Sequence, residues 1–443
     1  MISSILGQPL SQKLENSILK TDAGKAIKTV SNAILNNLVD SIFQFVDQLI
    51  LPSQLRFGQP SKIYSNTNVF EHGGKHYSVA ENYLPQEINL ISLETYGNWN
   101  PSEKWSRPFT SHPKKAPETG ELVTVGIDAT KPYCVMADGK ELVHKLDLQL
   151  NHCSLFHDIG VTKKYNILID FMLTMSSERI MKGGQLFEYE REKDARIAVF
   201  PRYGDVDSIK WFHIEPCVSY HLMNCFEDGD EVVVRGCKAN AAIIPGPIWG
   251  EDKFDWFSRG FDFKNIASNN GINDDKAIED GMLFTSVREW RLNMETLEVN
   301  ERDVTGTEYS MDFPMINENF TGRNHQYGYT QVIDSIASSK AGKSKYGGLA
   351  KLYFNEEDGE GNVKMEYHWL PENNFCTGSA FVAKPEGVEE DDGWIVTFAH
   401  DEDNDTSYVL VVDAKEFGGE PIAKINLPQR VPYGYHGSFF SST

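Results

Sequence analysis

Residues 393–413 read GWIVTFAHDEDNDTSYVLVVD, two apolar runs on either side of a polar turn. Runs of this kind, rich in β-branched and aromatic residues, favour β-strands. Similar runs lie at 122–127, 166–171 and 231–234, and Asp-Gly turns recur at 138–139, 228–229 and 392–393. Because no helical segment of comparable strength interrupts them after Pro52, the pattern predicts an antiparallel sandwich, barrel or propeller. No repeat of blade length can be read by eye, so periodicity does not choose among the three.

Composition narrows the class of protein further. The 443 residues are 40% hydrophobic, which is ample for at least one large core. The 64 acidic and 42 basic side chains give a formal net charge of -22, which repels phosphate backbones and predicts no nucleic-acid partner. The six cysteines form no CxxC pair and are too sparse for a disulfide framework. They indicate buried thiols in a reducing compartment.

The front of the chain differs from the rest. Apolar residues from Ile27 to Leu49 recur at helical spacing until Pro52 ends the pattern, which predicts an amphipathic helix. Its apolar face either packs on the domain or makes a peripheral membrane contact, although the polar face carries Asp40 and Asp47 where lysines would be expected. No linker rich in Pro, Gly or Ser follows. We therefore expect a helical lead at 1–52 and one continuous β domain at 53–443.

No secretory signal or transmembrane helix is visible. The first seven residues lack a basic region and a long apolar core, so we expect a protein that is not secreted.

Histidines are the side chains that could carry chemistry, because the sequence has no GxSxG, HExxH, phosphate loop or spaced Cys/His zinc pattern. Four of the twelve lie at the edges of strand-like runs beside aromatic or apolar residues: His112, His157, His221 and His436. Any one of them alone is more typical of a hydrogen-bonded core or loop residue. Four neutral imidazoles suit Fe, Cu, Ni or Zn if the fold brings strand ends to one axis, as a propeller does.

The stretches around these histidines carry a resemblance. From about Ser65 to the C-terminus the sequence resembles the carotenoid cleavage oxygenase family, and most of all its plant 9,10-cleavage dioxygenases. The matching stretches are SNTNV at 65–69, PFTSHPK at 108–114, TGEL at 119–122, HDIGVT at 157–162, PRYG at 201–204, HLMN at 221–224, EDGD at 227–230, EDDGW at 390–394 and RVPYGYHG at 430–437.

The resemblance implies a seven-bladed β-propeller with one Fe(II) on its axis. His112, His157, His221 and His436 match the four ligand positions of the family, which uses no carboxylate ligand. The implied reaction is the cleavage of a conjugated carbon–carbon double bond of a carotenoid or apocarotenoid by O2, giving two carbonyl products. Aromatic residues next to the motifs are candidates for lining the substrate tunnel, although core packing is the commoner role: Phe109, Phe156, Tyr220, Phe313 and Tyr435.

The family's three supporting glutamates are matched only in part. Such acids accept a hydrogen bond from the second ring nitrogen of a metal-bound histidine and thereby orient it. Glu81 matches the first position, Asp312 stands at the second with one methylene less, and Gly378 falls at the third. We therefore expect two of the four histidines, at most, to be supported by an acid.

A second departure lies at the front. Segments like Arg-Asn-Gly-Pro and Gly-Asp-Gly-Met, which relatives carry before the 65–69 region, do not occur here, so we expect a propeller that is incomplete at its N-terminal seam. This leaves two alternatives to a dioxygenase: a truncated, catalytically silent apocarotenoid-binding protein, and a closed structural metal site. An isomerase of the same family is a further option. The plant relatives imply the plastid or the cytoplasm, while the early acids Glu15 and Asp22 are untypical of a transit peptide.

Overall fold

The computed structural model describes residues 65–441, with gaps. The gaps are 82, 100–104, 106–107, 129–130, 139–141, 151, 177, 180–181, 183, 245, 247–251, 262–280 and 435. The predicted helical lead, its amphipathic helix and the boundary at residue 52 lie outside the described residues, and so does Tyr435. These remain predictions.

The chain divides into two compact units. One comprises residues 1–63 and 176–186, and in its described part the amide of Ser176 donates a hydrogen bond to the carbonyl of Leu186 (3.0 Å). The other comprises residues 64–175 and 187–443 and contains every strand given below.

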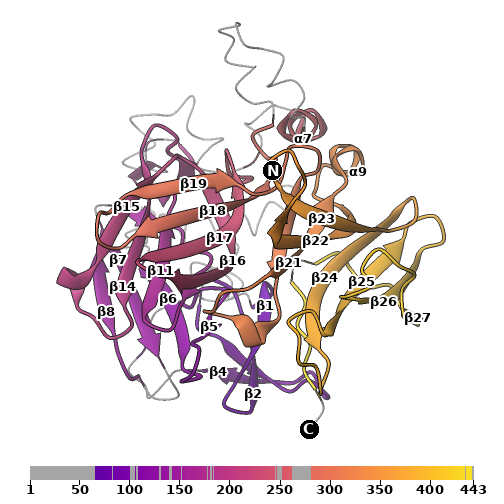
Figure 1. The fold of residues 1–443 in the computed structure, drawn as a ribbon, viewed down its shortest axis with the longest axis horizontal. Coiled ribbons are helices and arrows are strands. Elements are labelled where there is room, and N and C mark those ends of the chain that lie inside the picture. The colour runs from indigo at the N-terminus through magenta and orange to yellow at the C-terminus, as the bar shows by residue number, and fades with distance from the viewer. Residues whose placement is uncertain are drawn as a thin grey trace, which may run out of the picture. The chain divides into compact units, whose positions relative to one another are not determined.

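The first three sheets of the larger unit each have four antiparallel strands (Figure 1). The first consists of β1 (Asn68–His72), β2 (Lys75–Val79), β3 (Gln86–Ile88) and β4 (Thr95–Asn98). The second consists of β5 (Lys114–Lys115), β6 (Leu122–Asp128), β7 (Lys131–Asp138) and β8 (Leu146–Gln149). The third consists of β10 (Gly160–Val161), β11 (Tyr165–Asp170), β14 (Ala195–Pro201) and β15 (Lys210–Ile214). Between them, β9 (Cys153–Ser154), β12 (Leu173–Met175) and β13 (Phe187–Tyr189) form a small three-stranded sheet.

The later strands continue the pattern. The next sheet consists of β16 (Val218–Asp228), β17 (Glu231–Ala239), β18 (Ser286–Asn293) and β19 (Val299–Asp303). The following four strands are β20 (Met311–Met315), β21 (Tyr327–Ile333), β22 (Tyr346–Glu357) and β23 (Val363–Trp369). The last four are β24 (Asn374–Ala383), β25 (Gly393–Asp401), β26 (Thr406–Asp413) and β27 (Ala423–Asn426). One β-pair, Tyr346 with Cys376, joins these two groups into an eight-stranded sheet.

Helices are short in the described ranges. They are the 3-10 turns η3 (Val206–Ser208) and η4 (Glu318–Phe320) and the α-helices α7 (Lys253–Phe261) and α9 (Ser335–Ala341). The α9 helix begins where the Asp334 carboxylate accepts the Ala337 amide (2.8 Å) and ends at Gly342, whose φ is 57°. None of the helices in these ranges is long and apolar enough to cross a membrane.

The strand predictions agree with the structure. The runs at 393–398 and 408–413 fall in β25 and β26, which pair through an antiparallel register that sets Trp394 opposite Asp413. Inward residues of β25 alternate with partly exposed ones, as expected of a strand with one better-buried face. By contrast Val232, Val233 and Val234 of β17 are all fully buried, because this strand is covered on both faces.

The hydrophobic core lies between successive sheets. One cluster joins the β11–β14 sheet to the β16–β18 sheet and includes Ile167, Val234 and Trp290. Equivalent clusters lie between each of the other consecutive pairs of sheets. Full burial of one such aliphatic side chain contributes roughly 1.5–3 kcal/mol, so each sheet is stabilised by its neighbours. Four-stranded antiparallel sheets packed face to face in sequence order are the blades of a β-propeller, and six of these blades lie among the described residues. The predicted all-β propeller is confirmed.

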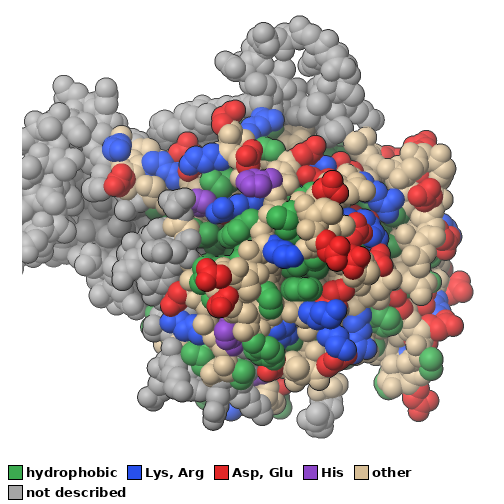
Figure 2. All heavy atoms as spheres, turned by 60° about the vertical axis from the view of Figure 1, so that its left-hand side comes forward, with side chains coloured by type: hydrophobic (Ala, Val, Ile, Leu, Met, Phe, Trp, Pro, Cys, Tyr) green, Lys and Arg blue, Asp and Glu red, His purple; other side chains and the backbone are tan. Residues whose placement is uncertain are grey.

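The first strands of successive blades lie next to one another and form the inside of the fold: β5, β10, β16, β20 and β24. Their ends therefore meet at one place although they are far apart in sequence. On the face drawn in Figure 2, basic and acidic side chains are mixed rather than separated by sign. Ion pairs such as Arg291 with Asp228 (3.0 Å) and Glu231 (2.6 Å) are of this kind.

Candidate metal centre

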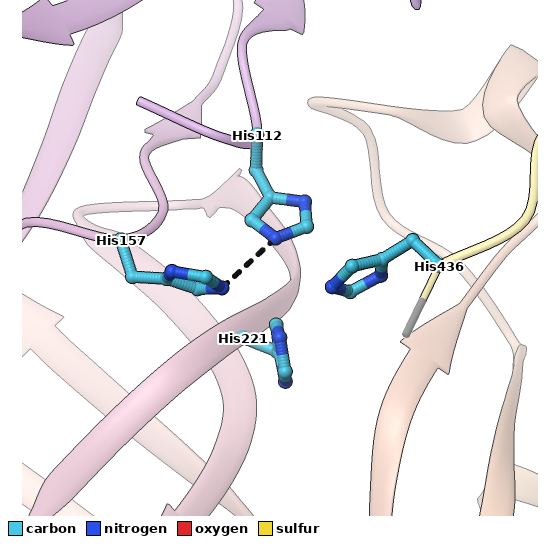
Figure 3. Close-up of side chains that lie close together, drawn as sticks. All are labelled: His112, His157, His221 and His436. Carbon is cyan, nitrogen blue, oxygen red and sulfur yellow. Dashed lines mark hydrogen bonds between the residues drawn. The ribbon is translucent and has the colours of Figure 1, made fainter. Parts of the chain in front are cut away.

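Four histidines meet at the inner strands, and their rings converge in Figure 3. His112 precedes β5, His157 precedes β10 and His221 lies within β16. His436 comes from the C-terminal segment that follows β27. An isolated parallel bridge between His112 and Asp158 fixes the first two segments side by side. The structure thus brings together the four residues that the sequence singled out.

The spacing of the rings suits a single ion. One nitrogen from each of the four histidines can be chosen so that all lie within 4.8 Å of one another. The Nε2 atoms of His112 and His157 are 3.1 Å apart. Two nitrogens at right angles around one first-row ion, each about 2.1 Å from it, would be separated by about this distance. No carboxylate joins the cluster as a fifth member among the described residues.

Burial disfavours the charged form of two of the four histidines. Desolvation lowers the pKa of His112 and of His436 well below the usual range, and the neighbouring histidine rings lower both further. Neutral imidazole is the form that binds a metal. The Nε2 atom of His221 is buried and has no hydrogen-bond partner in the described structure. An unpaired buried nitrogen facing three others costs free energy unless something binds it, so the donor set fits a metal ion.

Two of the histidine rings contact an acid through Nδ1. The Nδ1–H of His221 donates to Oδ1 of Asp312 on β20 (2.8 Å), and Nδ1 of His157 pairs with Oε1 of Glu81. Each contact favours the tautomer whose Nε2 carries no proton and faces the cluster. Burial raises the pKa of Asp312, but the His221 ring and the Phe313 amide outweigh it and lower the pKa overall. Glu81 behaves alike, with His157 as the main lowering partner.

In the described structure no acid is paired with the His112 ring or with the His436 ring, and the family's third acid would be expected beside His436. In the described residues no hydrogen bond reaches the His436 side chain, and the sequence position expected to carry the third acid is Gly378. Gly378 has a φ of 62°, in the left-handed region that favours glycine. A Cβ built there would lie 3.5 Å from the His436 carbonyl oxygen. The residue therefore faces the backbone that carries His436 rather than its ring.

Asp158 is a supporting residue that the sequence reasoning did not single out. Its buried carboxylate accepts the amides of Ile159 (2.7 Å) and Leu222 (2.8 Å) and forms an ion pair with Lys114 (3.0 Å). It thus ties together the three segments that carry His112, His157 and His221. Its position next to His157 in the HDIGVT stretch is the only signal in the sequence, and that signal does not say what the carboxylate contacts.

The aromatic candidates divide into two groups. The Phe313 ring lies 4.8 Å from the His221 ring and 4.7 Å from the His436 ring, and Tyr220 lies edge-on to His157 at 5.6 Å. These two border the cluster. Phe109 instead packs against Trp99 and Trp105 with its ring tilted to both, and Phe156 is part of the core between the second and third blades. Packing explains both of the latter.

Comparison with known proteins agrees with this fold. The family described as "Retinal pigment epithelial membrane protein" matches residues 12–441, and the chain belongs to this family, that of the carotenoid cleavage oxygenases.

Individual relatives give the degree of similarity. The chain is 30% identical over 395 residues to carotenoid 9,10(9',10')-cleavage dioxygenase 1 of Pisum sativum, with 85% of this chain and 66% of the pea protein covered. It is 28% identical over 389 residues to the chromoplastic zeaxanthin 7,8(7',8')-cleavage dioxygenase of Crocus sativus, covering 85% of this chain and 94% of that protein. The chain thus spans just under two thirds of the length of the pea relative.

A solved structure shares the fold. The lignostilbene dioxygenase of Pseudomonas brassicacearum matches with a TM-score of 0.72 at 21% identity, over 88% of this chain and 82% of that one.

Proposed function

We propose that this protein is an Fe(II)-dependent dioxygenase that cleaves a conjugated carbon–carbon double bond of a carotenoid or apocarotenoid with O2, giving two carbonyl products. The observation that carries the proposal is the convergence of four histidines, two buried and two half-buried, with one nitrogen of each within 4.8 Å of the others. The dioxygenase names of the relatives from pea and crocus support the same reaction class.

The donor set narrows the choice of metal. Four neutral imidazoles without a carboxylate suit Fe, Cu, Ni or Zn. Reaction with O2 needs a metal that changes its oxidation state, which Zn does not, and Fe(II) is the ion of the family that the sequence resembles. When bound, the ion would supply the site at which O2 is activated.

The protein's own residues would hold and shield that ion. His112, His157, His221 and His436 would be its ligands, each through a ring nitrogen that carries no proton. Glu81 and Asp312 would keep the Nδ1 protons of His157 and His221 on the outer side, so that both Nε2 lone pairs point inward. The rings of Phe313 and Tyr220 border the cluster and would exclude water from it.

We also propose a location and a domain organisation for the chain. The crocus relative is named chromoplastic, which supports a plastid location, with the cytoplasm as the alternative. A peripheral membrane contact through residues 27–49 and a domain boundary at residue 52 stay as predicted from the sequence. Fractionation of cells that express the full chain tests the plastid location and the peripheral membrane contact together.

Iron content is the decisive test. The purified protein is expected to hold about one iron per chain, and His221→Ala to lose it, because that variant removes one ligand of four. His213→Ala is the matched control, since this histidine is exposed and remote from the cluster. Little iron in a parent protein that melts cooperatively would overturn the proposal.

Products distinguish an enzyme from a binding protein. The iron-loaded chain is incubated with carotenoids and apocarotenoids with and without O2, and with a stilbene as a substrate of different shape. O2-dependent appearance of two carbonyl products is expected from a carotenoid class of substrate. Bound pigment without such products would favour a silent apocarotenoid-binding protein instead.

A further inference from the structure

The segment that carries His436 runs over the last blade and is fastened to it. We call residues 431–440 the C-terminal strap. The Val431 amide donates to Oγ of Ser407 on β26 (2.9 Å), and the Tyr433 hydroxyl donates to Oε1 of Glu402 just after β25 (2.9 Å). These contacts fix where the strap begins.

Two residues of β24 hold the strap next to His436. The Gly434 amide donates to Oγ1 of Thr377 (3.0 Å), and the same hydroxyl donates to the Gly434 carbonyl (3.0 Å). One buried side chain therefore satisfies both backbone groups of Gly434. At Gly437, the residue after His436, the two backbones approach closely: a Cβ on Gly437 would lie 1.9 Å from the Gly378 carbonyl oxygen. Only glycine at 437 allows the strap to pass.

The far end of the strap reaches the first blade. The Ser438 hydroxyl donates to the carbonyl of Val69 in β1 (2.6 Å), and the Phe440 ring meets the His76 ring of β2 edge-on at 4.6 Å. The strap thus connects the last described blade to the first, with His436 between the two attachments.

We propose that Thr377 is the positioning residue for His436 and that the seated strap replaces the carboxylate found behind His157 and His221. Seating the strap then completes the metal centre and ties the β24 blade to the β1 blade, so metal binding and strap seating favour each other. This inference rests on the metal centre of the proposed function. The coupling is reciprocal, since an ion that binds only the seated form must stabilise that form.

Thr377→Val tests the contact in the full-length, metal-free protein titrated with Co2+. Valine keeps the shape of threonine but removes both hydrogen bonds to Gly434. The apparent Kd for Co2+ is expected to rise at least about tenfold, the usual effect of losing a partner that orients a metal ligand. Thr377→Ser, which retains the hydroxyl, should restore the Kd to within about threefold of the parent value.

Thr330→Val is the matched control. Thr330 is also a buried strand threonine, but its hydroxyl has no hydrogen-bond partner in the described structure. Its replacement is expected to leave the Co2+ affinity unchanged. Equal Co2+ affinities of Thr377→Val and Thr330→Val would overturn the assignment of Thr377.

Amide hydrogen exchange tests the seating of the strap independently of metal binding. Without metal, Thr377→Val should speed exchange across residues 431–440, while Thr330→Val leaves it at the parent rate. Co2+ should slow exchange of this segment in the parent. If the parent takes up neither Fe2+ nor Co2+, the proposed function and the coupling fail, whereas faster exchange in Thr377→Val would still support the seating of the strap by Thr377. Unchanged exchange in Thr377→Val would overturn that seating.

Discussion

The two sides of the histidine cluster are built in different ways. His157 and His221 are each held by a carboxylate on Nδ1, from Glu81 and Asp312. His436 has no such partner, and its place is set by the backbone of the strap against Thr377 and Gly378. An acid fixes a ring directly, whereas a strap fixes the chain on which the ring stands. Substitution of an acid should therefore reduce the metal affinity in part, because the histidine stays in place. Displacement of the strap should reduce it much further, because His436 moves away with the strap.

Blocking the strap gives the largest expected effect. Gly437→Ala would place a Cβ 1.9 Å from the Gly378 carbonyl oxygen, a distance that no side chain tolerates, so the strap must lift away with His436. We expect Co2+ affinity to fall by more than about a hundredfold, while the propeller still melts cooperatively but at a lower temperature, because the strap no longer joins the two blades. Calorimetric titration with Co2+ measures the affinity, and circular dichroism follows the melt.

The control lies on the same strap. A Cβ on Gly434 would meet only Oγ1 of Thr377, at 3.9 Å, so Gly434→Ala should bind Co2+ nearly as the parent does. Equal Co2+ binding by Gly437→Ala and the parent would contradict the backbone contact and remove the distinction between the two sides.

Removing the acid that pairs with His221 should lower the affinity for Co2+ by a smaller factor. Asp312→Ala leaves the Nδ1–H of His221 without its acceptor and frees the ring to turn, so Co2+ affinity should fall about ten- to a hundredfold. Asp312→Glu, which keeps the carboxylate, should recover part of the loss. Asp147→Ala, at an exposed carboxylate paired only with Lys145 at 3.5 Å, is the control. Full Co2+ affinity in Asp312→Ala would show that the acid plays no part in holding the ligand.

His325, a buried histidine outside the cluster, should make the stability of the protein depend on pH. Burial and then the charge of Arg235 lower the pKa of His325 to about 3. The unfolded chain takes up a proton on this residue below about pH 6.5 while the folded chain does not, so stability falls as the pH falls from about 6.5 toward 3. Between pH 7.5 and 5.5 this histidine alone should remove about 1.4 kcal/mol from the free energy of unfolding.

Urea unfolding of the metal-free protein at the two pH values measures that loss. His325→Gln can still donate and accept a hydrogen bond but does not titrate, so its stability should depend less on pH by the stated amount. His213→Gln, at an exposed position, should keep the pH dependence of the parent. A His325→Gln protein with the parent's pH dependence would mean that His325 is not held neutral by the fold.

The smallest effect is expected at Gly378. Here a Cβ would make only ordinary contacts at 3.5 Å, but alanine must adopt a φ of 62°. Gly378→Ala should therefore cost about 1 kcal/mol of stability and change Co2+ affinity by less than about threefold. Gly361→Ala, with a φ of 91° and no atom within 4 Å, gives the backbone cost alone. A much weaker Co2+ affinity in Gly378→Ala than in Gly361→Ala would show that the strap needs glycine on both sides of the contact.

Much of the fold could be predicted from the sequence, and so could the acids that pair with two of the four histidines. Runs such as 393–398 and 408–413 became β25 and β26 because alternation and β-branched residues act locally. Glu81 and Asp312 were found through resemblance, and in the structure their carboxylates contact the Nδ1 atoms of His157 and His221. Among the aromatic candidates, Phe109 and Phe156 instead pack in the core. Adjacency in sequence does not say which way a side chain points.

The sequence by itself determined that the chain is built of short antiparallel strands and singled out four of its histidines, because strand propensity and residue identity are local properties. Only the tertiary structure decided how those histidines are held. The Asp158 carboxylate contacts an amide 64 residues away, and Thr377 contacts a backbone segment 57 residues away. Which of many available polar groups meet across such separations is set by the packing of whole blades, since buried hydrogen-bonding groups must find their partners in the assembled fold.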